Sequence, residues 1–213
     1  MMSIDLHGLI GNDVFKFPEN LDKSEYWKHY ITEKENSGKM NLTVFVANNF
    51  PRIDLPRQGI FFLKNQKCAD AVIWEPLNGK RYRLHLFEMK HTVKPSVWSK
   101  IKDQFNGAYL CCRLIAYLLD WEIDNCTVLY SVYHEERFQN PPIENTDPIL
   151  ERVPTDSNKV CEKTEWDSNQ CNILSDVSLS HFGELNFRHT KIKLEKSDPN
   201  AIPSGESFLC DVE

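Results

Sequence analysis

The sequence predicts an α/β fold in which a central mixed β-sheet is flanked by helices. Two β-type runs, at residues 69–74 and 82–90, are separated by Asn78-Gly79, the dipeptide most typical of a tight hairpin turn. Residues 95–119 carry apolar side chains at helical spacing, and residues 126–133 form an almost wholly apolar run. A strand, a helix and a strand in this order indicate that residues 126–133 lie parallel to residues 82–90.

An earlier helix is predicted at residues 22–36, after an irregular or short-strand lead at residues 1–20. Asp22 and Glu25 have the spacing of a capping box, and Ser37-Gly38 supplies a stop signal. The side chains that would share one face of this helix are Trp27, Tyr30, Ile31 and Lys34.

Two short strands are expected next, at residues 41–47 and 60–63, because both are rich in β-branched or aromatic side chains. The long helix is then expected to begin at Pro95, with Ser96 as its cap, and to end near Leu119.

The expected domain organisation is a core at residues 1–139, followed by a proline-bearing linker or extended loop at residues 140–158. An acidic accessory segment at residues 159–213 follows, which is either separate or part of the same domain. Weak strand patterns at residues 172–179 and 184–194 predict that this segment contains β-structure and extends the sheet or pairs with a partner.

The composition is that of a globular protein. Apolar residues make up 41% of the 213 residues, which is enough for a hydrophobic core. No apolar run reaches the roughly 18 residues of a membrane span, and the first residues lack a secretory signal pattern, so we expect a cytoplasmic protein without a membrane partner. The seven cysteines are odd in number and form no CxxC pair, which favours reduced thiols over disulfides or a zinc site.

Three charged residues are expected to meet at one edge of the hairpin. Alternation along the second run places Glu88 and Lys90 on the face that also carries Leu84 and Leu86. Antiparallel pairing brings Asp70, at the start of the first run, beside the end of the second. Two carboxylates on rigid strands are suitable ligands for a hard divalent cation, because such ions prefer oxygen.

These residues resemble the PD-(D/E)xK nuclease superfamily, which includes restriction endonucleases, Holliday-junction resolvases and RecB-type nucleases. The resemblance is carried by Asp70, the hairpin, the Glu88-Met89-Lys90 tripeptide and the following helix. It implies a restriction-endonuclease-like fold and covers residues 22–135 in order of elements.

The resemblance also implies roles for individual residues. Asp70, Glu88 and the carbonyl of Met89 would bind Mg²⁺ or Mn²⁺, and Lys90 would position or activate the attacking water. Gln104, on the following helix, would assist catalysis. Ala69 stands where many members have proline, and Tyr109 lies five residues after Gln104 where the RecB-type spacing is four, so a role for Tyr109 is doubtful.

Several alternatives remain open at the level of sequence. Glu88 and Lys90 can also be read as an ordinary ion pair at a strand end. Many members of the superfamily have a further glutamate on the first core helix, and the sequence does not choose between Glu25 and Glu33 for that role. His134-Glu135-Glu136 is either a second ligand set or a solvated strand terminus.

Charge is distributed unevenly along the chain. Residues 1–142 hold 18 basic and 17 acidic side chains, whereas residues 143–213 hold 7 and 14. Lys94, Lys100 and Lys102 lie near the start of the long helix, without an acidic residue among residues 90–102, and are the expected nucleic-acid-binding residues. A solvated helix start is the alternative explanation.

The sequence thus predicts a metal-dependent nuclease, a hydrolase that cleaves nucleic acid, with DNA as the favoured substrate. The alternative is a catalytically inactive protein of the same fold that binds nucleic acid or another protein. A weaker alternative is an unrelated α/β subunit of a complex, docked through its acidic tail. A homodimer, or a partner protein bound through the C-terminal segment, is a further expectation.

Overall fold

The computed structural model of the protein describes seven segments of the chain. They are residues 15–19, 26–35, 38–47, 50–53, 68–138, 164–168 and 186–209. Within them the chain forms two mixed β-sheets and one long helix, and strand is the dominant secondary structure. The fold class is therefore mixed α/β, as the sequence predicts.

The first sheet has the strand order β1-β4-β5-β6-β8-β9, and β7 pairs with β6 beside this path. Its strands are β1 (Phe15–Lys16), β4 (Arg52–Ile53), β5 (Ala71–Pro76), β6 (Arg81–Val93), β7 (Glu122–Ile123), β8 (Cys126–Glu136) and β9 (Asn186–Lys193). The second sheet has the order β10-β3-β2, formed by β10 (Ser204–Leu209), β3 (Gly38–Val46) and β2 (Trp27–Glu35). The helix is α2 (Pro95–Leu119).

The predicted order of a hairpin, a helix and a parallel strand is confirmed by β5, β6, α2 and β8. β5 and β6 pair antiparallel around the Asn78-Gly79 turn, where Leu77 N–H donates to the Arg81 carbonyl at 2.9 Å. Gly79 has a φ of 62°, a left-handed conformation that glycine adopts without a steric penalty. β8 pairs parallel with β6, and α2 connects the two strands.

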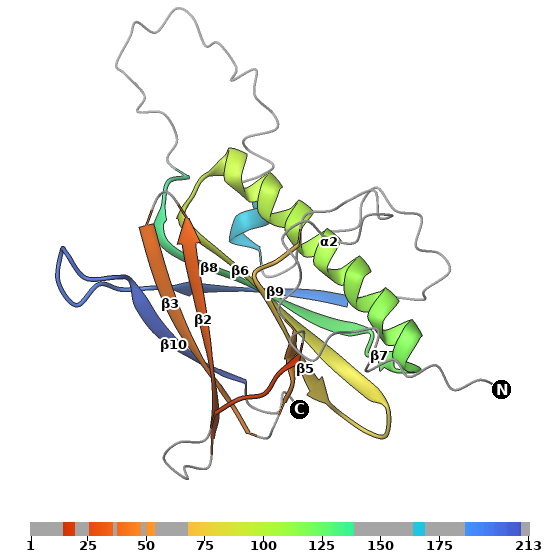
Figure 1. Ribbon diagram of the computed structural model, residues 1–213. Coiled ribbons are helices and arrows are strands. Elements are labelled where there is room, and N and C mark those ends of the chain that lie inside the picture. Colours follow the sequence, from red (N-terminus) through yellow and green to blue (C-terminus); the bar gives the residue numbers. More distant parts are fainter. Residues whose placement is uncertain are drawn as a thin grey trace, which may run out of the picture.

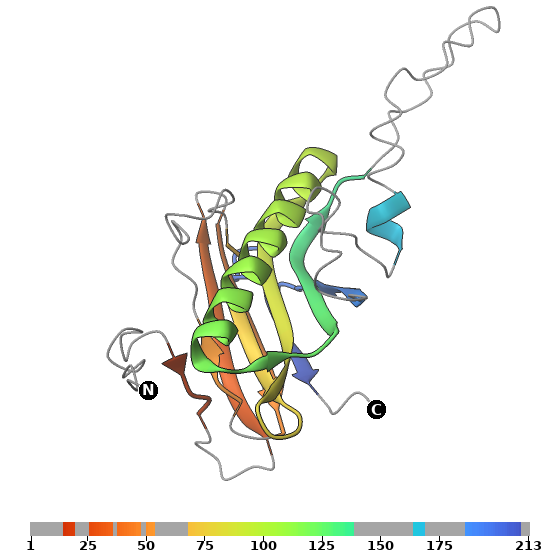
Figure 2. The same cartoon turned by 90° about the vertical axis from the view of Figure 1, so that its right-hand side faces the viewer.

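α2 lies across one face of the first sheet, as Figures 1 and 2 show from two directions. Its buried side is continuous with the apolar residues of that face, including Leu84, Leu86 and Leu129. The residues that the helix buries are Trp98, Ile101, Phe105, Gly107, Ala108, Tyr109, Cys111, Cys112, Ile115 and Ala116. No helix in the described segments is long and apolar enough to cross a lipid bilayer.

The prediction that Ser96 caps this helix is wrong. The N-cap is Lys94, whose side chain makes no capping hydrogen bond, and Pro95 opens the first turn. Proline is favoured there because its missing N–H would have no partner within the helix and its φ is already helical. Only Lys94 therefore separates the end of β6 at Val93 from the start of α2 at Pro95.

The opposite face of the first sheet is covered by the second sheet, and not by a helix as predicted. Leu42, Val44 and Ile31 of the second sheet pack against Ile73 and Phe87 of the first. The described residues thus form three layers, with the first sheet between α2 and the second sheet (Figures 1 and 2). The strands of the central layer are consequently apolar on both faces.

The helix predicted at residues 22–36 is wrong, because Trp27–Glu35 is strand β2. Tyr30 is 48% exposed whereas its neighbour Ile31 is 4% exposed, so burial alternates with the period of a strand. The β-forming side chains of this segment and its nine-residue antiparallel pairing with β3 outweigh the helical spacing of its apolar residues. Asp22 and Glu25 lie outside the described residues.

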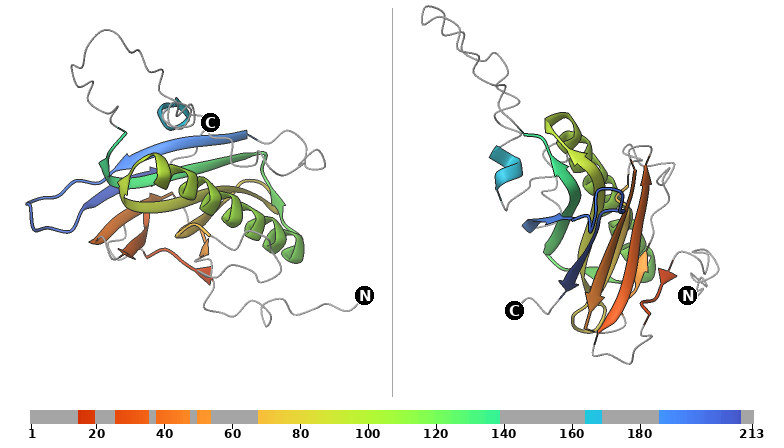
Figure 3. Two further views of the ribbon diagram at one scale, coloured as in Figure 1. Left: turned by 90° about the horizontal axis from the view of Figure 1, so that it is seen from above. Right: turned by 90° about the vertical axis from the view of Figure 1, so that its left-hand side faces the viewer.

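The C-terminal part of the chain contributes one strand to each sheet. β9 pairs parallel with β8, which confirms the strand predicted at residues 184–194, and β10 pairs parallel with β3. Figure 3 shows the chain pass from the side of β8 to the side of β3. The strand at 41–47 is confirmed by β3, whereas those at 60–63 and 172–179, and the linker at 140–158, lie outside the described residues.

We expect Leu86→Ala to lower the free energy of unfolding by about 2–5 kcal/mol, because Leu86 is fully buried between the first sheet and α2 and its truncation leaves a cavity. Leu118→Ala, on the exposed side of the same helix, is the matched control and should change it by less than about 0.5 kcal/mol. Chemical denaturation measures both. Equal effects would contradict the three-layer packing.

Candidate functional site

Asp70, Glu88 and Lys90 meet at the end of the β5–β6 hairpin. The last paired residues are Ala71 and Phe87, and continuing this register places Asp70 opposite Glu88. Directly opposed residues of antiparallel strands point to the same face of a sheet. The Oδ2 atom of Asp70 accepts a hydrogen bond from the backbone N–H of Met89 at 2.7 Å, which fixes the carboxyl group beside β6. The predicted convergence is therefore present.

The side chains of Glu88 and Lys90 form an ion pair. Lys90 Nζ lies 2.7 Å from Glu88 Oε1, the Glu88 side chain is fully buried, and the Lys90 side chain is 15% exposed. Both residues continue the face of β6 that packs Leu84 and Leu86 against α2. A buried carboxylate requires a compensating charge, which Lys90 supplies here.

A third carboxyl group joins the site from the second sheet. Glu33 of β2 is buried and hydrogen-bonds the Asp70 side chain. The sequence left Glu25 and Glu33 as alternatives on a helix, whereas the structure brings Glu33 to Asp70 from a strand. The signal in the sequence was the alternation of His29, Ile31 and Glu33 as buried residues, which becomes visible only when the segment is treated as a strand.

The pKa of Asp70 is raised from 3.8 to about 9. Removal of its carboxyl group from water is the largest cause, followed by the negative charge of Glu88 and the hydrogen bond with Glu33, while the charge of Lys90 lowers the pKa. At neutral pH, Asp70 is therefore protonated, and its proton is available for the hydrogen bond with Glu33. The arrangement holds three acidic groups with one cationic side chain.

The donor set suits a hard divalent cation. Carboxylate oxygens are the ligands that Mg²⁺ prefers, and a divalent ion would relieve the repulsion that raises the Asp70 pKa. The Met89 N–H points toward Asp70, and because the N–H and C=O of one strand residue face the same side, the Met89 carbonyl faces it too. Among the described residues, no three His, Cys, Asp or Glu side chains are already arranged as metal ligands. The carbonyl and water would have to complete the coordination.

Comparisons with protein-family models, curated proteins and solved structures found no match to the chain. What the site does must therefore be inferred from its own side chains.

Gln104 contacts the backbone of the segment that precedes Asp70. Its Nε2 atom is 3.5 Å from the carbonyl oxygen of Cys68, two residues before Asp70. Its position thus fits support of the segment that carries Asp70. Tyr109 is buried, and the centre of its ring lies 5.2 Å from that of Phe187.

The predicted nucleic-acid-binding lysines differ in their surroundings. Lys94 and Lys100 are exposed. Lys102 forms an ion pair with Glu165, and its Nζ atom lies 5.9 Å from the centre of the Trp98 ring. Two of the three side chains are thus accessible at the start of α2, whereas Lys102 also helps to hold the helical turn that contains Glu165.

Cys68 and Cys111 lie side by side next to the site, with their Sγ atoms 3.6 Å apart. These residues, Cys112 and Cys126 are free thiols, which agrees with the expectation of reduced cysteines for the described part of the chain. Hydrogen bonding with Cys111 and burial raise the pKa of the Cys68 thiol, so it is neutral at physiological pH. Cys111 and Cys112 are buried and pack as small apolar groups, whereas Cys68 and Cys126 are partly exposed.

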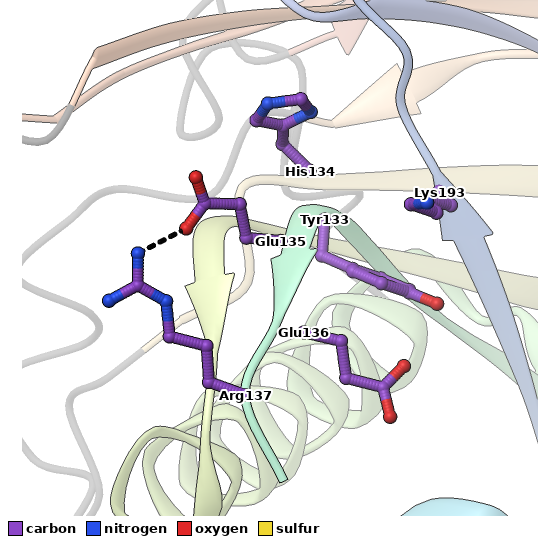
Figure 4. A pocket seen from close by; sticks show the side chains of 6 residues that line it. All are labelled: Tyr133, His134, Glu135, Glu136, Arg137 and Lys193. Carbon is purple, nitrogen blue, oxygen red and sulfur yellow. Dashed lines mark hydrogen bonds and ion pairs between the residues drawn. The ribbon is translucent and has the colours of Figure 1, made fainter. Parts of the chain in front are cut away.

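A pocket of about 510 Å³ lies at the end of β8, close to the start of α2. It is lined by Tyr133, His134, Glu135, Glu136, Arg137 and Lys193, as Figure 4 shows. Glu135 accepts hydrogen bonds from Arg137 at 2.6 Å and from Thr92 at 3.3 Å. The carboxylate of Glu135 is therefore already neutralised, and His134-Glu135-Glu136 do not form a three-ligand site.

We expect Asp70→Asn to stabilise the metal-free protein at pH 8 by roughly 2 kcal/mol or more. Asp70 ionises near 3.8 in the unfolded chain and near 9 in the folded one, so between these values folding takes up a proton and stability falls as pH rises. Asparagine keeps the hydrogen-bonding atoms and removes this cost. Thermal unfolding from pH 5 to pH 8 should show a gain that grows with pH.

Asp120→Asn is the matched control, because Asp120 is exposed and its pKa is lowered by a hydrogen bond from Lys80. It should not show a stabilisation that grows with pH. A destabilised Asp70→Asn protein with an unchanged pH dependence would contradict the protonation of Asp70.

Proposed function

We propose that the chain is a Mg²⁺- or Mn²⁺-dependent nuclease of the PD-(D/E)xK type that hydrolyses phosphodiester bonds of nucleic acid, with DNA as the favoured substrate. The observation that carries the proposal is the convergence of Asp70, Glu88 and Lys90 on one face of the first sheet. An acid at the start of one strand, an acid and a lysine two residues apart on the next, and a helix covering their face are the parts that the resemblance requires.

The connectivity supports the finer proposal of a restriction-endonuclease-like core. The β5–β6 hairpin, the connecting helix α2 and the parallel strand β8 occur in the expected order. The described part of the chain departs from the expected fold in the layer opposite α2, where β2, β3 and β10 take the place expected for a helix. The β5–β6 hairpin and α2, which position Asp70, Glu88 and Lys90, are the same whether a helix or a sheet covers the opposite face.

Asp70, Glu88 and the carbonyl of Met89 would hold the metal ion, with Glu33 as a further carboxylate beside Asp70. When bound, Mg²⁺ or Mn²⁺ would polarise the scissile phosphate and lower the pKa of a coordinated water. Asp70 would lose its proton when the ion binds, because the ionised carboxylate is the form that acts as a ligand. Binding therefore includes the loss of a proton.

Lys90 would orient the attacking water and stabilise the negative charge that develops on the phosphate. Its ammonium group is held 2.7 Å from Glu88 and stays partly accessible to solvent. A fixed ammonium beside the metal ligands does not have to reorganise during the reaction, which is the condition under which electrostatic stabilisation is most effective. Lys94 and Lys100, exposed at the start of α2, would contact the phosphate backbone.

One observation favours the second candidate, a catalytically silent nucleic-acid-binding or protein-interaction subunit. Lys90 pairs with the Glu88 carboxylate, and Asp70 is protonated, so neither carboxyl group depends on a metal ion to compensate its charge. A protein that had lost catalysis could keep such a self-contained network. The two candidates differ in whether divalent ions bind and whether nucleic acid is cleaved.

We expect Glu88→Gln and Lys90→Ala each to reduce metal-dependent cleavage at least about 100-fold while the fold is retained. The assay incubates plasmid, linear and single-stranded DNA and RNA with Mg²⁺, Mn²⁺ or EDTA. Lys80→Ala and Glu122→Gln are matched controls, because both residues are exposed and lie at the opposite end of β6 and its parallel neighbour. Full cleavage by Glu88→Gln or Lys90→Ala would remove the proposal. Metal-independent nucleic-acid binding without cleavage by the wild type would favour the silent protein.

We also expect the apparent affinity for Mg²⁺ to rise with pH by about tenfold per unit between pH 6 and pH 8. The metal must displace the proton that Asp70 retains up to about pH 9, so each unit of acidity favours the protonated, metal-free form. Cleavage rates measured against Mg²⁺ concentration at pH 6, 7 and 8 give this dependence. A half-saturating Mg²⁺ concentration that does not change with pH would contradict it.

A further inference from the structure

His91 and His134 form a pair on the face of the first sheet opposite Lys90. The register pairs Lys90 with Tyr133 and Thr92 with Glu135 across the parallel strands β6 and β8, so His91 lies beside His134. The centres of the two imidazole rings are 5.2 Å apart, and the ring planes are inclined by 71°. Both residues are half-buried. The pair lies at the end of the sheet, next to the pocket of Figure 4, in which His134 projects from β8.

The hydrogen bonds of His134 fix which ring nitrogen carries its proton. Its Nδ1 atom is 2.9 Å from the backbone carbonyl oxygen of Leu194. A carbonyl oxygen only accepts hydrogen bonds, so Nδ1 is the donor. In the neutral ring the lone pair therefore resides on Nε2.

The position of the proton on His91 follows from two linked hydrogen bonds, from His91 to Thr92 and from Thr92 to Glu135, which we call the Thr92–Glu135 relay. Thr92 Oγ1 donates its only hydroxyl hydrogen to Glu135 Oε2 at 3.3 Å, so the oxygen can only accept from His91 Nδ1, which is 3.3 Å away. The lone pair of neutral His91 is thus also on Nε2. Gly38 leaves room for this ring, because a Cβ atom at that position would be 3.3 Å from His91 Cδ2.

We propose that His91 and His134 form a second metal site, for a borderline transition metal ion such as Zn²⁺, bound through the Nε2 atoms of both rings. Two imidazoles bound to one tetrahedral ion have ring centres about 5 Å apart, given Zn–N bonds of about 2.0–2.1 Å. The separation of 5.2 Å matches this value. Metal-binding histidines characteristically donate their other N–H to a carbonyl or to a carboxylate, as the Leu194 carbonyl and the Thr92–Glu135 relay allow here.

The ligand type separates this site from the carboxylates of the proposed nuclease site. Imidazole nitrogen favours Zn²⁺, Cu²⁺ or Ni²⁺, whereas Mg²⁺ favours carboxylate and water oxygen. Because no three candidate ligand side chains converge in the described part of the chain, the histidines would supply two ligands and water the others. The bound ion would tie the ends of β6 and β8 together, one residue from Lys90, and would stabilise the fold whether or not the chain is a nuclease.

The test is calorimetric titration of the full chain with Zn²⁺ at pH 7.5, together with thermal unfolding with and without Zn²⁺. We expect one ion per chain at this site and a rise in melting temperature of about 5–11 °C at a hundredfold excess over Kd. His91→Ala and His134→Ala should each weaken binding at least tenfold, and the double variant should lose this site. Thr92→Val, which removes the relay but no ligand, should weaken binding severalfold.

Lys193→Ala is the matched control, because Lys193 lines the adjacent pocket without belonging to the pair. The double variant Asp70→Asn/Glu88→Gln should retain the Zn²⁺ site, so a failure of the nuclease proposal and a failure of this one are distinguishable.

Cu²⁺ loading followed by electron paramagnetic resonance should show two nitrogen ligands in the wild type. Wild-type affinity and stoichiometry in a folded double-histidine variant, or no binding by the wild type, would overturn the proposal. If the alanine variants do not fold, His91→Gln and His134→Gln provide the same comparison.

Discussion

The described structure depends on how three acidic side chains and one lysine are held where water is largely excluded. Glu88 is fully buried and paired with Lys90, and Asp70, whose pKa is raised, keeps its proton and hydrogen-bonds Glu33. A folded protein gains no stability from collecting carboxyl groups in this way, because desolvation and mutual repulsion both oppose it. Such a cost is characteristic of functional sites, where binding a cation or a substrate compensates for it.

The scaffold makes this arrangement possible by fixing backbone positions on both sides of it. The turn at Gly79 sets the register of β5 against β6, and therefore places Asp70 opposite Glu88. α2 covers the face on which these residues lie, while the second sheet supports the other face and delivers Glu33. The site is thus built on paired strands, whose geometry is more rigid than that of loops.

The two faces of β6 carry different kinds of potential ligand near the same end of the strand. Lys90 pairs with Glu88 on the face that α2 covers, and the next residue, His91, lies on the other face, beside Gly38 of the second sheet and His134. Alternation along a strand therefore separates an oxygen-rich group of side chains from a nitrogen-rich one by a single residue. An ion bound at either position would stabilise the same end of β6, which provides a physical route for coupling between them.

Sequence reasoning succeeded where local signals and the topology agreed. The Asn-Gly turn, the alternation along β6 and the helical spacing of α2 are each strong within a short window, and together they predicted the positions of Asp70, Glu88 and Lys90. It failed at β2, where the spacing of Trp27, Tyr30 and Ile31 fits a helix but pairing with β3 decides the outcome.

Long-range contacts were the other source of error. β10 pairs with β3 from the far end of the chain, and no local pattern at either strand specifies the other as its partner. The contact between Glu33 and Asp70 depends on the same packing of the second sheet on the first. The sequence marks His134 only together with Glu135 and Glu136, and does not pair it with His91, because only the β6–β8 register brings the two histidines together.

The most direct measurement of the central claim is the titration of the Asp70 carboxyl carbon by ¹³C NMR, with and without Mg²⁺. Burial of Asp70 and the charge of Glu88 beside it predict an apparent pKa of about 9 in the metal-free protein and a clear decrease in that pKa when Mg²⁺ is added. An Asp70 carboxyl that is already ionised at pH 6 and does not respond to Mg²⁺ would contradict the account.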